Sequence, residues 1–283
     1  APLVNTTLMK TGYFRLNTGG NVVFDGLKFD NENYRGAYDA NSNGKYGLCV
    51  TLKNSIVEGN ENNADAVYAA HGGKTILYND IITGSYTYSA VFSRGDSLII
   101  NKCHISGAQL EGGVGLSGGY LNIDSTSITE NAENGIYLLN YGSAIVTNSV
   151  ITKNGGDGIS AGSGSITLKN NRIGVDGKGN AAGNRIGVNV YSNTTGSIIE
   201  DNIIAGNDST GIIINGGTTN VIKGNYIGTD KDFNNLGNGS DGLFIGGRCS
   251  VTFQSSLDSA NYIGFNKKHG IYSQAMTLGN VSF

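Results

Sequence analysis

The sequence predicts an all-β solenoid of about ten coils, each with three short strands. Three observations support this fold class: a short motif recurs along the chain, 45 of the 283 residues are glycine, and apolar residues return at fixed positions of the repeat. A regular period of about 20 to 50 residues is the signature of a repeat architecture. Glycine at this level, without a collagen period, suits a fold with many turns.

The first strand of each coil begins with glycine or alanine followed by an aliphatic residue. Copies follow one another at intervals of about 19 to 31 residues along the chain. The copies are Gly47-Leu48, Ala66-Val67, Ala90-Val91, Gly113-Val114, Gly135-Ile136, Gly158-Ile159, Gly187-Val188, Gly211-Ile212, Gly242-Leu243 and Gly270-Ile271. Successive side chains of a strand point to opposite faces. The residue after the aliphatic one is therefore expected to point outward.

The second strand of each coil ends in Ile or Val, which we place in the core. These residues are Val57, Ile82, Ile105, Ile128, Ile151, Ile173, Ile204, Ile227 and Ile263. The residue two positions earlier also points inward, and it is polar in most coils: Ser55, Asp80, Cys103, Thr126, Ser149, Asn171, Asn202, Asn225 and Asn261. Buried polar groups need hydrogen bonds, and stacked amides supply them to one another. The Asn run therefore predicts a structural ladder.

A third short strand lies between these two, for example at Ile99-Ile100 and Ile145-Val146. Three strands per coil and an Asn ladder resemble the right-handed parallel β-helix of the pectate-lyase-like superfamily, in its bacterial surface type. The resemblance covers residues from about 20 to 280, including lengthened turns after Ile173 and Ile227. It implies a secreted or cell-surface location. In architecture the chain is similar to the tāpirins, which are cellulose-binding surface proteins.

Composition excludes several classes of function. The net charge of −3 gives no electrostatic basis for nucleic-acid binding, and no apolar run reaches the length of a membrane span. Cys49, Cys103 and Cys249 lack the spacing of a metal site and are interpreted as isolated thiols. We expect a single domain over residues 1–283, and we expect it to be a fragment of a longer protein because both ends look cut.

Residues 30–45 are predicted to form an inserted loop that carries Tyr34 and Tyr38. Such a loop is either part of a binding face or a decoration. Within it, Asp39, Asn41 and Asn43 match the first half of a calcium loop, but the later Glu is absent. Asp230, Asp232 and Asn234 form a weaker oxygen cluster. No cofactor or metal is predicted, and calcium at Asp39, Asn41 and Asn43 is the alternative.

Polysaccharide lyases and hydrolases of this superfamily suggest an enzymatic function, but their patterns are missing. The chain has no Asp-Asp pair and no Gly-His-Gly segment. The nearest alternative is a basic trio of Arg94, His71 and Lys74 on one face, which would abstract a proton next to a uronate carboxylate. Solvated surface charge explains the same residues without chemistry.

The outward position of the first strand carries an aromatic row. Read along the stack, it is Cys49, Tyr68, Phe92, Gly115, Tyr137, Ser160, Asn189, Ile213, Phe244 and Tyr272, and the next outward row adds Leu139 and Tyr191. A solvated face of a sheet should carry polar residues, and an exposed apolar stripe marks an interface. Aromatic rings stack on sugar rings. Either a glycan or a protein segment, such as the loop, a missing domain or another subunit, is expected to cover this row.

The leading interpretation is a non-catalytic polysaccharide-binding domain for adhesion, with cellulose as a candidate partner. The residues expected to contact the glycan are Tyr34, Tyr38, Tyr68, Phe92, Tyr137, Tyr191, Phe244 and Tyr272. A polysaccharide lyase or related enzyme and a structural stalk of the tailspike type are the two alternatives. Nucleic acid and membrane insertion are not expected.

Overall fold

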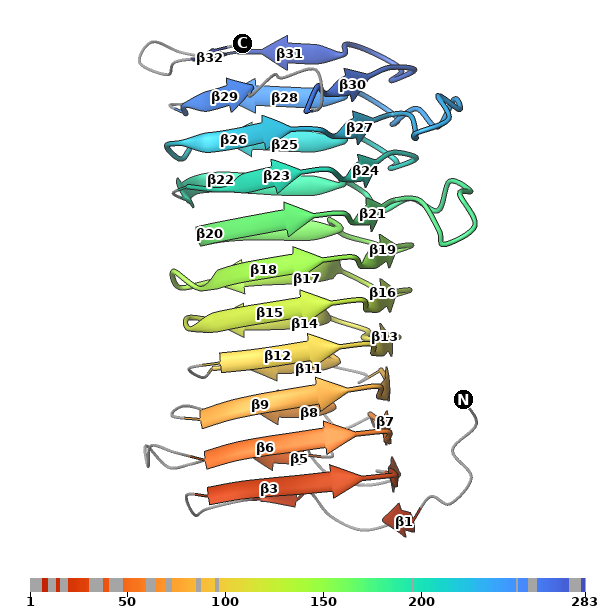
Figure 1. Ribbon diagram of the computed structural model, residues 1–283, viewed down its shortest axis with the longest axis vertical. Helices are drawn as coiled ribbons and strands as arrows, with labels where there is room; N and C mark the ends of the chain where they lie inside the picture. The colour runs from red at the N-terminus through yellow and green to blue at the C-terminus, as the bar shows by residue number, and fades with distance from the viewer. Residues whose placement is uncertain are drawn as a thin grey trace.

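The computed structural model is a right-handed parallel β-helix whose coils stack along one axis, as the sequence predicts (Figure 1). The structure describes residues 7–9, 14–15, 20–30, 38–40, 48–59, 65–69, 73–84, 88–94, 97–194, 196–247, 249–253, 259–274 and 281–282. The chain visits three sheets, here named B, C and A, once in each coil. In Figure 1 sheet C faces the viewer, sheet B lies behind it and sheet A forms the right-hand edge. Within the described ranges, no helix could cross a membrane.

The strands of each sheet pair in parallel with the strands of the coils before and after. Sheet A contains β1 (Thr7–Met9), β4 (Leu27–Asp30), β7 (Ile56–Glu58), β10 (Ile81–Thr83), β13 (His104–Ser106), β16 (Ser127–Thr129), β19 (Val150–Thr152), β21 (Arg172–Ile173), β24 (Ile203–Ile204), β27 (Tyr226–Ile227) and β30 (Tyr262–Ile263). Sheet B contains β2 (Phe14–Arg15), β5 (Tyr38–Ala40), β8 (Val67–Ala69), β11 (Val91–Ser93), β14 (Gly112–Ser117), β17 (Asn134–Leu139), β22 (Val188–Thr194), β25 (Ile212–Asn215), β28 (Leu243–Gly246) and β31 (Ile271–Ser273). Sheet C contains β3 (Gly20–Asp25), β6 (Leu48–Lys53), β9 (Gly73–Tyr78), β12 (Ser97–Asn101), β15 (Tyr120–Asp124), β18 (Ser143–Thr147), β23 (Ile198–Glu200), β26 (Asn220–Lys223), β29 (Val251–Phe253) and β32 (Val281–Ser282). Strand β20 (Ile159–Lys169) turns the corner and belongs to both B and C.

The predicted column of Ile and Val fills the interior along sheet A. Ile128 pairs with Ile151, and Ile151 pairs with Ile173, so identical side chains lie above one another. Every member from Val57 to Ile227 is fully buried. Ile263 is only partly buried, in the last strand of sheet A that the structure describes. This regular stacking allows a narrow core to run the whole length of the molecule.

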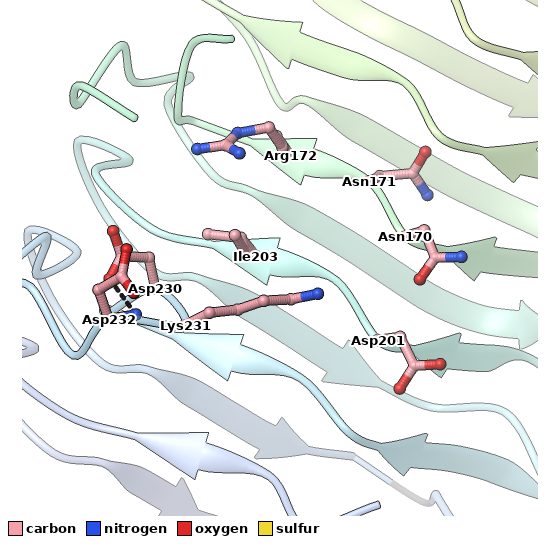
Figure 2. Close-up of a pocket in the computed structure, with 8 residues that line it drawn as sticks. All are labelled: Asn170, Asn171, Arg172, Asp201, Ile203, Asp230, Lys231 and Asp232. Atoms are coloured by element: carbon pink, nitrogen blue, oxygen red, sulfur yellow. Dashed lines mark hydrogen bonds between the residues drawn. The ribbon is translucent and has the colours of Figure 1, made fainter. Parts of the chain in front are cut away.

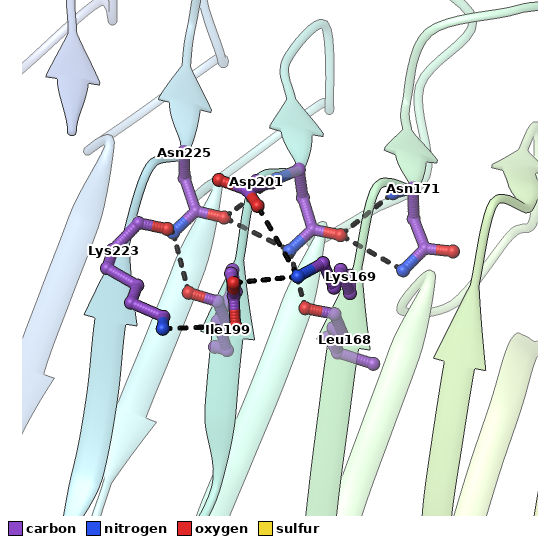
Figure 3. A network of polar contacts seen from close by, with 9 residues as sticks. Leu168, Lys169, Asn171, Ile199, Asp201, Lys223 and Asn225 are labelled. Carbon is purple, nitrogen blue, oxygen red and sulfur yellow. Dashed lines mark hydrogen bonds and ion pairs between the residues drawn. The ribbon is translucent and has the colours of Figure 1, made fainter. Parts of the chain in front are cut away.

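The predicted Asn ladder lies at the turn from sheet C to sheet A and is confirmed (Figure 3). The Nδ2 atoms of Asn171, Asn202 and Asn225 each donate to Oδ1 of the next ladder residue at 3.0 Å, ending at Asn261. Each Oδ1 also accepts the backbone N–H of the preceding ladder residue. Asn202 is fully buried. The amides therefore satisfy one another inside an otherwise apolar core.

A second Asn ladder lies at the turn from sheet A to sheet B and was not predicted. Nδ2 of each member donates to Oδ1 of the next at 2.8 to 3.1 Å. Its members are Asn131, Asn154, Asn184, Asn207, Asn238 and Asn266. Each precedes the glycine of the recurrent motif by three or four residues. The two ladders hold both turns that flank sheet A.

The recurrent glycine is required by close packing against this second ladder. A Cβ atom on Gly158 would lie 2.7 Å from the carbonyl oxygen of Gly187, 2.9 Å from Asn184 Nδ2 and 2.9 Å from Ile173 Cγ2. Gly135 meets the same three kinds of atom one coil earlier, at 2.6 to 2.9 Å. Because packed interiors have no room for an added methyl group, the glycine of the motif is a packing requirement and does not depend on its backbone angles.

The turn from sheet C to sheet A depends on one residue in the left-handed region. Seven such residues have φ between 51° and 57°: Asn54, Asn79, Lys102, Ser125, Asn148, Asn170 and Asp201. Asn and Asp tolerate this conformation better than other non-glycine residues. This preference explains why Asn recurs one position before the ladder residue.

Two expectations near the N-terminus need correction. Cys49 lies in β6 of sheet C, beside Lys74, and is not part of the outward row of sheet B. The strand of sheet B in this coil is β5, which pairs Asp39 with Tyr68. Residues 38–40 of the predicted inserted loop are thus a coil strand, and 31–37 and 41–47 lie outside the described residues. The other copies of the motif begin strands of sheet B, whereas Leu48 begins β6, the strand of sheet C that follows β5 in the same coil.

Candidate functional site

The outer face of sheet B carries a stack of three aromatic side chains, as the sequence predicts. Tyr68, Phe92 and Tyr137 come from β8, β11 and β17. The ring centroids of Tyr68 and Phe92 are 6.2 Å apart, and those of Phe92 and Tyr137 are 6.1 Å apart, with nearly parallel planes in both pairs. Because the coils stack along the axis, the three rings form a platform that runs in the same direction.

Gly115 makes this stack possible. It occupies the coil between Phe92 and Tyr137, and a Cβ atom there would lie 2.3 Å from Tyr137 Cζ and 2.5 Å from Phe92 Cδ2. The Tyr137 ring therefore lies across the glycine and closes the gap of one coil. Phe92 and Tyr137 are only 9% and 8% exposed as a result. The predicted stripe points outward, but its centre is buried by its own members.

A polar network borders the platform where the strands of sheet B begin. The Tyr137 hydroxyl donates to Glu111 Oε2 at 2.8 Å and lies within hydrogen-bond distance of Ser89 Oγ, at 2.6 Å. The backbone N–H of Ser89 donates to Asp65 Oδ1 at 2.9 Å. Burial raises the pKa of the Tyr137 phenol above its ordinary value. The network places two carboxyl groups beside the rings.

The carboxyl group of Asp65 is protonated over much of the acidic range. Burial is the main cause that raises its pKa to about 7, and the charge of Glu111 adds to the rise. The hydrogen bond from Ser89 and the charge of Arg94 act in the opposite direction. The Arg94 guanidinium lies over the Phe92 ring, with Cζ 5.8 Å from the centroid. The site thus contains a cation, an anion and a carboxyl group that exchanges its proton near neutral pH.

Two adjoining hollows of about 480 and 330 Å³ open above this arrangement. Both are lined by Phe92, Arg94 and Glu111. The first extends to Asp65, Tyr68 and Tyr88, and the second extends to Glu133, Asn134, Tyr137 and Leu139. We call the two hollows together the sheet B groove. It has an aromatic floor and charged walls, and it is open to solvent along its length.

The remaining predicted residues lie elsewhere. Phe244 and Tyr272 contact each other in β28 and β31, with centroids 5.7 Å apart, but Ser160, Asn189 and Ile213 separate them from Tyr137. Tyr191 is exposed and accepts a hydrogen bond from Asn189 Nδ2 at 2.8 Å. The aromatic row is therefore two clusters, and only the first borders the groove.

Several predicted residues lie outside the described part of the chain. These are Tyr34, Asn41, Asn43 and His71, together with the side chains of Tyr38 and Asp39. The basic trio is not confirmed, because Lys74 lies in β9 of sheet C whereas Arg94 follows β11 of sheet B.

The weaker oxygen cluster is explained by a turn. Asp230 Oδ1 accepts the backbone N–H groups of Asp232 and Asn234 at 3.0 Å, and Oδ2 accepts Asn234 Nδ2 at 2.9 Å. Among the residues that the structure describes, no three His, Cys, Asp or Glu side chains are grouped to hold a metal ion.

Sequence reasoning missed Asp65, Ser89 and Glu111. Asp65 and Ser89 each stand one residue before the Ala-aliphatic pair that starts a strand of sheet B. Polar residues at that repeat position, directly beside an outward aromatic row, were a usable signal. Glu111 lies in a turn, where no repeat position marked it.

The chain belongs to the family described as the right-handed beta helix region, whose pattern matches residues 112–272. No curated protein sequence matches it. The alginate lyase from Paenibacillus sp. str. FPU-7 has a similar structure, with a TM-score of 0.53, 18% identity, and coverage of 85% of this chain and 92% of the lyase.

Two further solved structures share the fold. The Dettilon tailspike protein (gp208) gives a TM-score of 0.62 at 15% identity, with 95% of this chain and 61% of the tailspike covered. The periplasmic alginate epimerase AlgG gives 0.53 at 12% identity, with 98% and 76% covered. At these identities the likeness concerns the fold.

Proposed function

We propose that this protein binds a neutral polysaccharide through the sheet B groove and works outside the cytoplasm. The observation that carries the proposal is the platform of Tyr68, Phe92 and Tyr137 between charged walls. Phe92 and Tyr137 are mostly covered by the stack, so apolar contact with a sugar ring is made chiefly by the more exposed Tyr68, which the other two rings hold in place. Glu111 and Arg94 accept from and donate to sugar hydroxyl groups. Similar structures include an alginate lyase and a periplasmic alginate epimerase, which by name act on a polysaccharide. They support a polysaccharide as the class of partner, whereas the choice of a neutral one depends on the charges of the groove.

The balance of charge favours a neutral glycan over an acidic one. Among the described residues that line the second hollow, Glu111 and Glu133 carry carboxyl groups and Arg94 carries a positive charge. An anionic chain would meet more carboxyl groups than cations among these residues. A neutral chain such as cellulose or xylan meets only hydrogen-bonding groups, and its binding should change little with salt.

The test is retention on microcrystalline cellulose, chitin and xylan, with alginate and pectate as acidic comparisons. Phe92→Ala removes the central ring, so retention on the bound neutral glycan should fall about five- to tenfold. Tyr120→Ala is the matched control, because it removes an outward tyrosine from β15 on sheet C. Equal retention by wild type, Phe92→Ala and Tyr120→Ala would refute the proposed site.

A second candidate function is cleavage of the bound glycan. The specific observation is that Asp65 and Glu111 line the same hollow and that burial raises the pKa of Asp65 to about 7. A carboxyl group of this kind protonates the glycosidic oxygen as its bond to the anomeric carbon breaks, while a water molecule forms the new bond to that carbon and gives its proton to Glu111. Release of reducing ends by the wild type, lost in Asp65→Asn while retention persists, would establish hydrolysis. If the wild type releases no product from any glycan that it binds, binding without cleavage is the function that remains.

A further inference from the structure

The outer face of sheet A carries a second groove, remote from sheet B in the cross-section of the coil. Lengthened turns follow β21 and β27 and project from the stack, whereas the intervening coil at β24 has a short turn (Figure 1). The two turns fold back on the sheet, where Val175, Ile203, Ala205, Tyr226 and Leu236 form a small apolar cluster outside the main core. This packing holds the walls of the groove in place.

Two hollows of about 320 and 370 Å³ make up this sheet A groove. Both are lined by Asn170, Asp201 and Lys231, so the hollows are continuous. Figure 2 shows Lys231 extended across the first hollow, with Arg172 and Asp232 on its borders. The turn that carries Lys231 is held in shape by Asp230, whose carboxylate accepts three hydrogen bonds from within the turn.

One end of the groove is an aromatic platform. Tyr226 and Tyr262 pair in register in sheet A, and their rings stack with centroids 5.0 Å apart and planes 13° apart. Phe233 stands edge-on to both rings, at 6.3 Å and 5.3 Å between centroids. Tyr262 is 39% exposed and Phe233 is 56% exposed. Two stacked, nearly parallel rings with a third ring edge-on to them form a corner against which the face and edge of a sugar ring can pack.

One polar atom of the groove lacks a hydrogen-bond partner. Arg172 lies in register with Ile203 on the groove floor, and its Nε atom is buried without a hydrogen-bond partner. A buried donor of this kind costs free energy until an acceptor arrives. Asp201, Asp230 and Asp232 outnumber Arg172 and Lys231 around the hollow. This excess of carboxylates disfavours an anionic ligand, and mixed donors and acceptors suit hydroxyl groups.

We propose that the sheet A groove is a second carbohydrate site, which takes a neutral oligosaccharide with a sugar ring on Tyr226 and Tyr262. The hydroxyl groups of the neighbouring sugars in the oligosaccharide reach Arg172, Asp201 and Lys231. The site depends on none of the residues of the sheet B groove. A chain with both sites holds two glycan segments at once, which raises retention on an insoluble polysaccharide well above that of either site.

The experiment is isothermal titration of the full chain with cellohexaose, xylohexaose and mannohexaose. The wild type should bind two molecules of at least one hexasaccharide per chain. Tyr262→Ala should reduce this number to one, or weaken one of the two sites at least tenfold, and Lys231→Ala should weaken the same site. Phe265→Ala is the control, because it removes an aromatic ring that is at least as exposed as Tyr262, 53% against 39%, from the same coil outside the lining of the groove.

The outcomes separate this inference from the sheet B proposal. If Tyr262→Ala loses one binding site and Phe92→Ala loses the other, the result supports both the sheet A groove and the sheet B groove as glycan sites. Loss in Tyr262→Ala with no effect of Phe92→Ala supports the sheet A groove alone. Two outcomes would overturn the second site. One is that every hexasaccharide bound by the wild type is bound equally by Tyr262→Ala and Lys231→Ala. The other is that the wild type binds none of the three.

Discussion

Replacement of Asn202 by Leu tests the ladder that supports the turn from sheet C to sheet A. The change deletes four hydrogen bonds: Nδ2 donates to Asn225 Oδ1 and to the Leu168 carbonyl at 3.0 Å, and Oδ1 accepts the backbone N–H and Nδ2 of Asn171 at 2.9 and 3.0 Å. Asn171 Nδ2 keeps the Val146 carbonyl, at 2.8 Å. The Asn171 N–H loses its acceptor inside the core.

The expected loss of stability follows from this count. A buried N–H left without an acceptor costs about 1–3 kcal/mol, and each of the three other lost bonds contributes about 0.5–1.5 kcal/mol. The free energy of unfolding should therefore fall by about 2.5–7.5 kcal/mol. The exposed Asn235, which makes one contact of 3.4 Å to the Gly237 N–H, provides the control: Asn235→Leu should change stability by less than about 0.5 kcal/mol.

Urea unfolding followed by far-ultraviolet circular dichroism measures the global effect, and hydrogen exchange measures the local one. In Asn202→Leu the unfolding midpoint should drop, and the Asn171 amide should exchange faster than amides three or more coils away. An unchanged midpoint together with full protection of the Asn171 amide would show that the ladder does not stabilise the fold as described.

Three further predictions concern packing and charge. Gly158→Ala should destabilise the fold by about 1–3 kcal/mol, because its Cβ would lie within 3 Å of three atoms; a melting temperature equal to that of the wild type would contradict the packing account. Ile151→Ala, at a fully buried position, should cost about 2–5 kcal/mol in urea unfolding, and a loss below 1 kcal/mol would argue against the column. Burial raises the pKa values of Asp65 and Asp80 to about 7 from 3.8; the folded state therefore holds protons that the unfolded chain has released, and stability should fall as pH rises from about 4 to about 7. Between about pH 4 and about pH 7 the thermal midpoint of Asp65→Asn, and that of Asp80→Asn, should fall less than that of the wild type. If the midpoint of a variant falls with pH as much as that of the wild type, the raised pKa assigned to that residue is wrong.

The sequence predicted those parts of the fold in which the same kind of residue returns at one position of each repeat. Ile151 and Asn202 belong to columns in which the same kind of residue returns in most coils, so alternation along the strand placed them correctly. The ladder through Asn154 was missed because its members lie in turns of variable length, at three or four residues from the motif. Cys49 was misplaced because Gly47-Leu48 copies the motif of one sheet at the start of another.

The candidate sites depend on contacts between coils, which no single repeat contains. Tyr68, Phe92 and Tyr137 were recognised as outward, but their mutual burial depends on the missing side chain of Gly115 between them. The sheet A groove was missed although Tyr226 and Tyr262 occupy one repeat position, because its walls are turns that fold back onto the sheet. Neighbouring surface in a solenoid comes from adjacent coils and from their insertions.

The central claim is that a glycan lies in the sheet B groove. Hydroxyl-radical footprinting of the protein bound to its retained polysaccharide tests this location most directly, with oxidation read by mass spectrometry. Tyr88 and Leu139 line the two hollows and are 43% and 45% exposed, whereas Tyr78, at 39%, lies on sheet C. The account predicts that bound glycan lowers the oxidation of Tyr88 and Leu139 and leaves Tyr78 unchanged. Equal oxidation of Tyr88 and Leu139 in the free and bound protein would contradict it.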